Sequence, residues 1–234
     1  MAFLQPGRGR PGPLGERSVP QVVFWAIGAM VAAHLVRVFL PAETATRLLD
    51  QYVFVPSRVA AHPLAELSTF LTHMFLQFDV TELAIACLAV LAFGTPVAAR
   101  FGWAMFLGLF LASGAISAAF ELALSPHSAL GLGGAFGAVS GVIAAAVRIA
   151  LGQRRDTTLV PAPLAPLLSV PVAVFSILWI GLAFIFPRDA WFDGKVVTAI
   201  QWPPVVGALA AGFALSSLFE LFVPKIDLGD DFGA

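Results

Sequence analysis

One apolar stretch constrains the fold of this chain more than any other: residues 132–152, LGGAFGAVSGVIAAAVRIALG. The stretch is long enough to cross a bilayer as a helix, yet its first half holds glycine and alanine rather than leucine. Small residues let helix backbones come close where helices pack inside membranes. The stretch therefore predicts a helix in the middle of a bundle. The glycines assigned this packing role are Gly133, Gly134, Gly137, Gly141, Gly207 and Gly212.

The rest of the chain has the composition of a membrane protein. Of its 234 residues, 59% are hydrophobic and 12% are charged, which is too apolar for a soluble domain of this size. Apolar blocks of about 20 residues span the roughly 30 Å of hydrocarbon as helices. An all-α bundle is expected, because exposed non-helical backbone is not tolerated in hydrocarbon. Six spans are predicted: Val19–Leu40, Phe78–Ala98, Phe101–Leu122, Leu132–Leu151, Leu167–Phe186 and Val197–Phe222.

The segments around the spans complete the predicted organisation. Residues 1–18 form a flexible tail rich in proline and glycine, residues 19–223 the membrane domain, and residues 224–234 an acidic tail. Residues 41–66 mix charged and apolar side chains, which predicts an interfacial connection. Lys and Arg are more frequent on the side of the two termini, which places both termini in the cytoplasm. That side holds Arg8, Arg10, Arg17, Arg100, Arg148, Arg154, Arg155 and Lys225, and the other holds Arg37, Arg47, Arg58, Arg188 and Lys195.

Several kinds of function receive no support from the composition. The formal net charge of −1 gives no reason to expect a nucleic-acid partner. Cys87 is the only cysteine, so no internal disulfide is possible. His62 and His127 are too isolated to predict a metal site, and no cofactor is expected. Four tryptophans are interpreted mainly as interfacial anchors: Trp103, Trp179, Trp191 and Trp202.

Short motifs in three of the predicted spans point to one family. They read THMFLQFDVTELAIA at residues 72–86, GAFGAVSG at residues 134–141 and VVGALAAG at residues 205–212. These motifs resemble the signatures of the second, fourth and sixth transmembrane helices of the rhomboid intramembrane serine proteases. FVPSR at residues 54–58, and AFG at residues 92–94 followed by Gly102, add to the resemblance, which covers roughly residues 50–222. The resemblance implies the six-helix rhomboid bundle.

The positions that carry catalysis in that family hold other residues here. The resemblance implies a serine nucleophile where this chain has Phe136, and a histidine base where it has Val205. It implies oxyanion donors where this chain has Glu82 and Ala86. A further histidine that the resemblance implies on the second helix is replaced by Gln77, and only His73 is kept. Phenylalanine offers no nucleophile, and an ionised Glu82 would repel an oxyanion. The sequence predicts a rhomboid-like protein without peptidase activity.

Ser140 is the residue through which activity could have been retained. It follows the nucleophile position by four residues, about one helical turn. Pairing with Glu82 or His73 is conceivable, but such a pair would lack oxyanion donors. Phe136 is interpreted as a plug, whose ring fills the volume where the substrate backbone enters an active rhomboid. The alternative interpretation, ordinary helix packing, differs little from this one. Glu82 has two open interpretations, facing an interior cavity or lying hydrated at the interface.

The function implied by the resemblance is binding rather than cleavage. A rhomboid fold without peptidase activity keeps a lateral opening that admits a transmembrane segment of another protein. We expect an adaptor, chaperone or accessory subunit of a membrane complex in a bacterial inner membrane, in contact with membrane lipid. An atypical active peptidase and a structural subunit of a larger assembly are the alternatives. Gln77 and His73 are expected to make local hydrogen bonds at the start of the second span.

Overall fold

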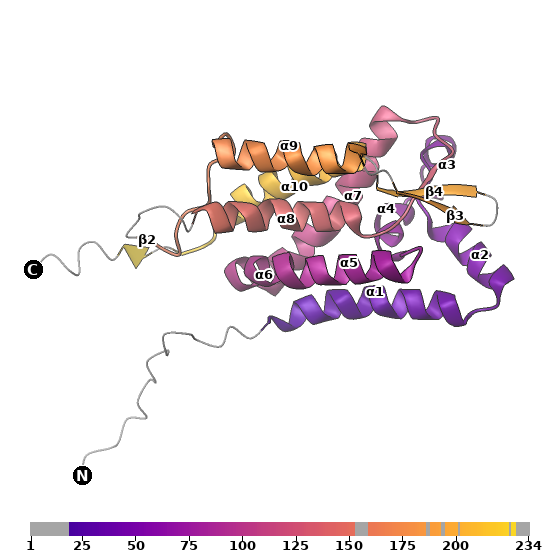
Figure 1. Ribbon diagram of the computed structural model, residues 1–234, viewed down its shortest axis with the longest axis horizontal. Helices are drawn as coiled ribbons and strands as arrows, with labels where there is room; N and C mark the ends of the chain where they lie inside the picture. The colour runs from indigo at the N-terminus through magenta and orange to yellow at the C-terminus, as the bar shows by residue number, and fades with distance from the viewer. Residues whose placement is uncertain are drawn as a thin grey trace, which may run out of the picture.

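The computed structural model describes residues 19–152, 159–185, 188–192, 195–200, 202–224 and 226–227. Its apolar helices lie with roughly parallel axes, and short helices and a β-hairpin gather at one end, here called the hairpin end (right in Figure 1). The predicted N-terminal tail and most of the predicted C-terminal tail lie outside the described residues, as do Arg154, Arg155 and Lys225.

Four helical stretches are long and apolar enough to cross a membrane, judged by length and composition. They are α1 (Gln21–Phe39), the stretch Val80–Phe101, α7 (Trp103–Leu124) and α10 (Trp202–Glu220). Two shorter apolar helices accompany them, α8 (Phe136–Gly152) and α9 (Val170–Ile185). Each of these stretches overlaps one predicted span, so the periodic apolar runs located the helices correctly.

Two of the predicted helix starts are wrong. α8 begins at Phe136 rather than at Leu132, because Gly134 has a φ of 89°, which no right-handed helix contains. α10 begins at Trp202 rather than at Val197, because residues 195–200 form a strand rich in β-branched side chains. Pro203 and Pro204 then occupy the first turn of α10, where a missing backbone N–H costs nothing.

The expectation of an exclusively helical fold is also incomplete. β3 (Arg188–Phe192) and β4 (Lys195–Ile200) pair antiparallel, so strands occupy the connection after the fifth predicted span and the first residues of the sixth. β4 pairs in parallel with β1 (Gly131–Leu132), which precedes α8. β2 (Leu159–Val160) and β5 (Ile226–Asp227) form a second, antiparallel pair.

The stretch Val80–Phe101 contains a π-helical segment. α5 (Val80–Ala89) passes into η2 (Val90–Gly94), and α6 (Thr95–Phe101) follows. Pro96 has no N–H to donate to the carbonyl four residues earlier, and its ring crowds that carbonyl. A wider turn relieves this conflict without ending the helix. The hydroxyl of Thr95 donates to Leu91 O at 2.5 Å within the same segment.

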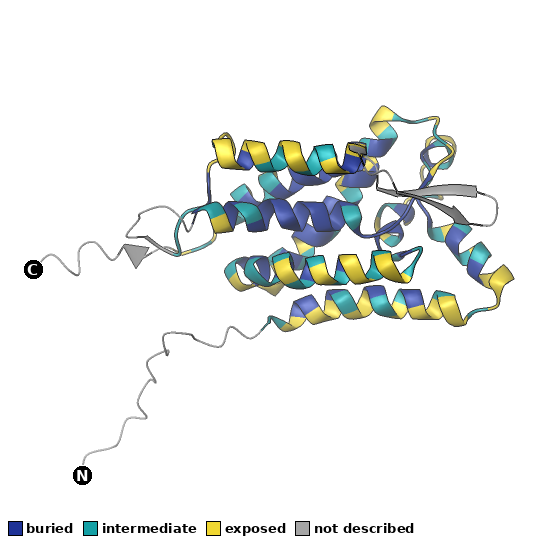
Figure 2. Ribbon diagram, viewed as in Figure 1, coloured by how far each residue is buried: buried dark blue, intermediate teal, exposed yellow. Residues whose placement is uncertain are grey.

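α8 is the most buried helix of the bundle (Figure 2) and contacts α5, α6, α7, α9 and α10. Its closest neighbour is α10, because Gly141 and Gly212 face each other where the two helices cross. A Cβ atom at Gly212 would lie 2.8 Å from Cα of Gly141. A Cβ atom at Gly137 would instead meet the side chain of Ser117 on α7. Gly212 thus lets the backbones of α10 and α8 meet, which is the role that small residues have where helices pack inside membranes.

Arg148 is buried inside the bundle, although the sequence placed it in a cytoplasmic turn. α8 continues to Gly152, and the Arg148 side chain turns toward α10. Its Nη1 donates to the hydroxyls of Ser216 (2.8 Å) and Ser217 (2.7 Å), and its Nε donates to Ala165 O (2.9 Å). One side chain therefore ties α8 to α10 and to the segment before α9.

Arg100 and Glu220 form a second polar contact at this end of the bundle, opposite the hairpin end. Their side chains lie 2.7 Å apart and are 5% and 13% exposed. Arg100 Nη2 also donates to Ala162 O at 2.8 Å. This ion pair joins the end of α6 to the end of α10, so both helix ends are held in place by charge.

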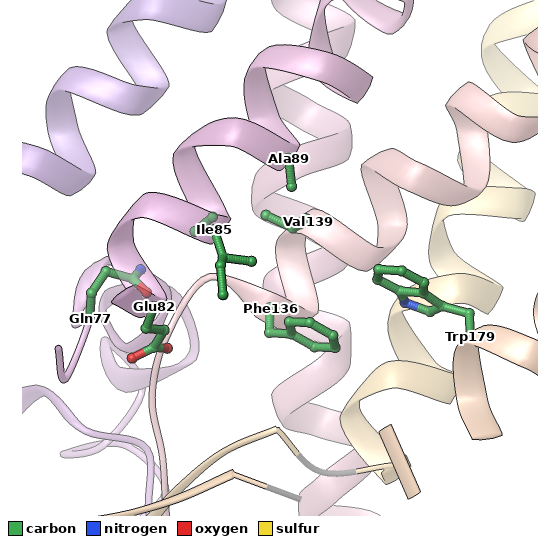
Figure 3. Close-up of a pocket in the computed structure, with 8 residues that line it drawn as sticks. Gln77, Glu82, Ile85, Ala89, Phe136, Val139 and Trp179 are labelled. Atoms are coloured by element: carbon green, nitrogen blue, oxygen red, sulfur yellow. The ribbon is translucent and has the colours of Figure 1, made fainter. Parts of the chain in front are cut away.

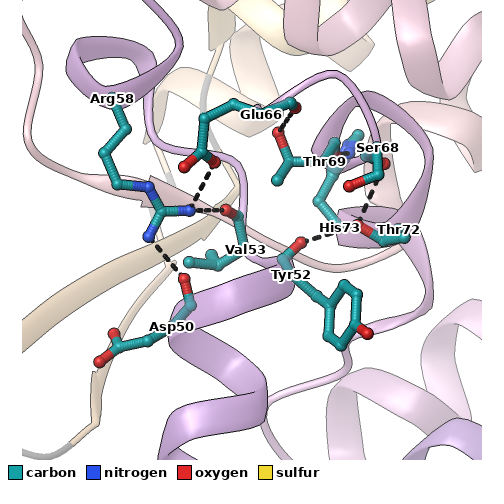
Figure 4. A network of polar contacts seen from close by, with 9 residues as sticks. All are labelled: Asp50, Tyr52, Val53, Arg58, Glu66, Ser68, Thr69, Thr72 and His73. Atoms are coloured by element: carbon teal, nitrogen blue, oxygen red, sulfur yellow. Dashed lines mark hydrogen bonds and ion pairs between the residues drawn. The ribbon is translucent and has the colours of Figure 1, made fainter. Parts of the chain in front are cut away.

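The predicted interfacial segment, residues 41–66, folds together with the residues that follow it into a cap at the hairpin end. Residues 41–66 contain α2 (Ala42–Tyr52) and α3 (Pro56–Ala61), and the cap also includes α4 (Thr69–Thr72) and the 3₁₀ turn η1 (His73–Phe75). Arg58 holds the cap together, because its guanidinium donates to Asp50 O (2.5 Å), Val53 O (2.8 Å) and Glu66 Oε2 (2.9 Å) (Figure 4). Thr72 Oγ1 donates to Tyr52 O at 3.0 Å and connects α4 to α2.

Candidate functional site

The start of α8 is held against the turn between η1 and α5. Gly134 N donates to His73 O at 3.0 Å, and Ala135 N donates to Gln77 Oε1 at 3.5 Å. At Gly134, a Cβ atom would overlap the carboxylate of Glu82, and its φ of 89° also disfavours any other residue. The glycine therefore brings the first turn of α8 directly beside Glu82.

Glu82 is positioned by the N-terminal cap of α5. Asp79 is the N-cap residue, and its Oδ1 accepts from Glu82 N at 2.7 Å. Glu82 Oε2 in turn accepts from Phe78 N at 2.8 Å, so two backbone N–H groups at the helix start are satisfied reciprocally. The Glu82 side chain is half-buried and lines a pocket, which supports the cavity interpretation over the hydrated one.

α1 holds the same turn from the other side. His34 Nδ1 donates to Gln77 O at 3.1 Å, and Arg37 Nη2 donates to Gln77 O (3.1 Å) and Phe78 O (3.0 Å). The guanidinium of Arg37 therefore turns inward to these carbonyls. Gln77 Nε2 donates to Met74 O at 3.0 Å, a local bond of the kind predicted for this residue.

A pocket lies between α5 and α9, over the start of α8 (Figure 3). Its empty volume is about 470 Å³, part of which is open to the surroundings. Gln77 and Glu82 lie at one side, Trp179 at the other, and Phe136 between them. Apart from Gln77 and Glu82 the lining is apolar, and it consists of Gln77, Glu82, Ile85, Ala86, Ala89, Phe136, Val139 and Trp179.

Ser140 lies next to this pocket beneath two stacked aromatic rings. The ring planes of Phe136 and Trp179 are nearly parallel, with centroids 5.7 Å apart and an interplanar angle of 5°. Ser140 Oγ donates to Phe136 O at 2.7 Å and accepts from Trp179 Nε1 at 3.1 Å. The hydroxyl is thus fully buried and bonded to these two residues, rather than to His73 or Glu82.

Val205 and Phe136 meet in one apolar cluster. Val205 is fully buried with Leu209, Ala144 and Ala183, and the ring of Phe136 packs against this cluster. The two positions that carry nucleophile and base in the resembling family therefore share the same interior. In the described part of the chain, the ring nitrogens of the histidines make no hydrogen bond with a serine or threonine hydroxyl.

His73 connects the cap to the start of α8. Its Nδ1 donates to Thr69 O at 2.8 Å, and its ring lies 5.9 Å from that of Phe54. Complete burial lowers the pKa of His73 to about 4, so the ring is neutral at pH 7. Its backbone carbonyl accepts from Gly134 N, which links the cap to the start of α8.

Trp179 lines the pocket, although from the sequence it is interpreted mainly as an interfacial anchor. Its spacing could have indicated an aromatic cluster, because Phe175 and Trp179 are four residues apart and share a helix face. The structure stacks them at 6.0 Å. No group of three His, Cys, Asp or Glu side chains able to hold a metal ion occurs among the described residues.

Fold and site together define a polytopic helical membrane protein with a small-residue central helix beside a mostly apolar pocket. The family model for the Rhomboid domain matches residues 64–221, which is more than half of the chain. The chain therefore belongs to the rhomboid family. Among curated proteins, none matches it in sequence.

Proposed function

We propose that this rhomboid family member has no peptidase activity and binds transmembrane helices of other membrane proteins. It would act as an adaptor, chaperone or accessory subunit in a bacterial inner membrane. Its six apolar helices would all span, with both termini in the cytoplasm. The larger set of Lys and Arg still lies on the terminal side after Arg148, which is buried, is left out.

The observation that carries this proposal is the state of Ser140. A serine becomes a nucleophile when a hydrogen-bonded base takes its proton. Here the proton of Ser140 points to Phe136 O, and the indole of Trp179 occupies a lone pair of the same oxygen. Glu82 lies in the pocket where an oxyanion would need donors, and its negative charge would raise the energy of such an intermediate.

Binding is supported by the exposed apolar surface beside the pocket. Ile85 and Leu88 on α5 are 50% and 65% exposed, and Ile85 also lines the pocket. In a bilayer such a surface contacts either lipid or another helix. The small side chains Ala86 and Ala89 leave room for a helix to pack closely beside them.

The absence of peptidase activity is tested with a serine-directed fluorophosphonate and with generic transmembrane substrates. We expect neither cleavage nor labelling of the purified protein. Labelling at Ser140, abolished in Ser140→Ala, would establish an atypical peptidase and refute the proposal.

Helix binding is tested by photocrosslinking in nanodiscs. A photoreactive amino acid at position 85 should capture a single-span Leu/Ala helix, whereas the same group at position 24 serves as the control. Phe24 is 56% exposed on α1, which lies on the far side of α5 from α9 (Figure 1). Equal capture at both positions would mean that the pocket face has no preference for helices over lipid. Co-purification of a stoichiometric partner would identify an accessory subunit.

A further inference from the structure

A second cavity continues the pocket along the same side of the bundle. It is lined by Ala92, Phe93 and Pro96 on one side, and by Ala146, Val147 and Ala150 of α8 on the other. The two cavities follow one face of α8, because positions 136, 139, 146 and 150 recur every three or four residues along this helix. On the other side they are bordered by α5 and by the η2–α6 segment that continues it. We call the two cavities together the groove, with α8 as its floor.

The length of this groove points to an extended occupant. From Glu82 to Pro96 the helix rises about 21 Å at 1.5 Å per residue. This is about two thirds of the roughly 30 Å of hydrocarbon that a span crosses. Five of the residues along the groove are alanines, at positions 86, 89, 92, 146 and 150, and these small side chains would let another backbone approach closely. A transmembrane helix has the length and shape that such a groove accommodates.

The charge at the hairpin end of the groove narrows the choice of helix. Two carboxylates, Glu82 and Asp79, stand beside one guanidinium, that of Arg37, and their charges act on it. Two carboxylates and one guanidinium leave a net charge of −1 on these three side chains. The hydrogen bonds of Arg37 to Gln77 O and Phe78 O hold the guanidinium at the turn, on the α1 side of the groove. Glu82 is the charged residue that lines the groove itself.

We infer that the groove binds a transmembrane helix of a partner protein, and that this helix places a Lys or Arg beside Glu82. This inference rests on the proposed function. A basic residue within a span has a high free-energy cost unless it finds a partner, and the carboxylate of Glu82 supplies one. An acidic residue at the same depth would be repelled by Glu82, so the groove selects a helix by charge as well as by shape. The rest of the partner's face is expected to be small and apolar, to match the alanines of the groove.

Designed helices test this inference on the full-length protein in nanodiscs of phosphatidylcholine and phosphatidylglycerol. Each probe is a Leu/Ala helix of about 20 residues with neutral Gly and Asn flanks and blocked termini. Three versions carry Lys, Leu or Glu near one end, and fluorescence energy transfer reports their affinity. Glu82→Gln is the test variant, because its amide oxygen can still accept from Phe78 N and keep the helix cap. Glu43→Gln is the matched control, since Glu43 is exposed on α2 and pairs with Arg47.

We expect the Lys probe to bind about tenfold more tightly than the Leu probe, and the Glu probe to bind most weakly. Glu82→Gln should abolish the preference for the Lys probe over the Leu probe, whereas Glu43→Gln should retain this preference. Equal binding of the Lys and Leu probes, or a Lys preference that survives in Glu82→Gln, would overturn the inference while leaving helix binding intact. Loss of Lys-probe binding on adding phosphatidylethanolamine would show a lipid amine as the occupant and would also overturn it. Failure of all three probes to crosslink from position 85 would refute the proposed function itself.

Discussion

Replacing Gly212 by alanine tests whether backbone contact between α8 and α10 holds this bundle together. The added Cβ would lie 2.8 Å from Cα and from the carbonyl carbon of Gly141, and closer still to its carbonyl oxygen. Ordinary contacts begin near 3.4 Å. The two helices must therefore separate by roughly 0.5–1 Å, a gap that forfeits a quarter to a half of the dispersion attraction at each affected contact. We expect Gly212→Ala to lower the free energy of unfolding by about 2 kcal/mol.

The control for this experiment is provided by other helical glycines. A Cβ atom at Gly28 in α1 or at Gly181 in α9 would meet nothing within 4 Å. Alanine there should be neutral or slightly stabilising, since it favours a helix over glycine by up to about 1 kcal/mol. Equilibrium unfolding in mixed micelles, followed by tryptophan fluorescence, compares the variants. The reasoning is refuted if Gly212→Ala unfolds at the same denaturant concentration as Gly181→Ala.

Two further predictions concern buried polar side chains. Arg148→Met should cost about 2 kcal/mol, because three N–H groups, one on Nε and two on Nη1, lose their acceptors on α10 and at Ala165 O, at about 0.6 kcal/mol each. Arg148→Lys should recover only part of this, and full recovery on unfolding would contradict a guanidinium-specific contact. Burial holds the pKa of His73 at about 4 in the folded protein, against the ordinary histidine value of 6.5, so the unfolded chain binds more protons between these values. Stability should therefore fall as the pH falls from 6.5 to 4, by at most about 3 kcal/mol, and parallel pH profiles of unfolding for the wild type and His73→Gln would contradict this assignment.

Residues close together in the chain carried most of what could be predicted. Apolar runs of spanning length located every long helix, because a lipid-facing helix must satisfy its backbone internally and show apolar side chains. The glycines around Gly141 predicted a central helix, since only a crowded interior rewards the loss of a side chain. The spacing of short motifs identified the family. The structure places Phe136 and Val205, the two positions singled out by those motifs, in one interior cluster.

Contacts between distant segments could not be predicted in this way. Hydropathy counted Arg148 as a loop charge, because it records neither the direction of a side chain nor the hydroxyls of Ser216 and Ser217 that receive it. Apolar content alone assigns residues 197–200 to the sixth span, because it does not record that β4 pairs with β1 and β3.

The residues alone thus determined a helical membrane protein of the rhomboid family, and they predict Phe136 and Val205 at the positions where the resemblance implies a nucleophile and a base. Tertiary structure decided what those positions now form. The stacking of Phe136 on Trp179, the two bonds of Ser140 and the place of Glu82 on the groove depend on helices far apart in sequence. Their relative position follows from the packing of the whole bundle, in which each contact holds only because many others do.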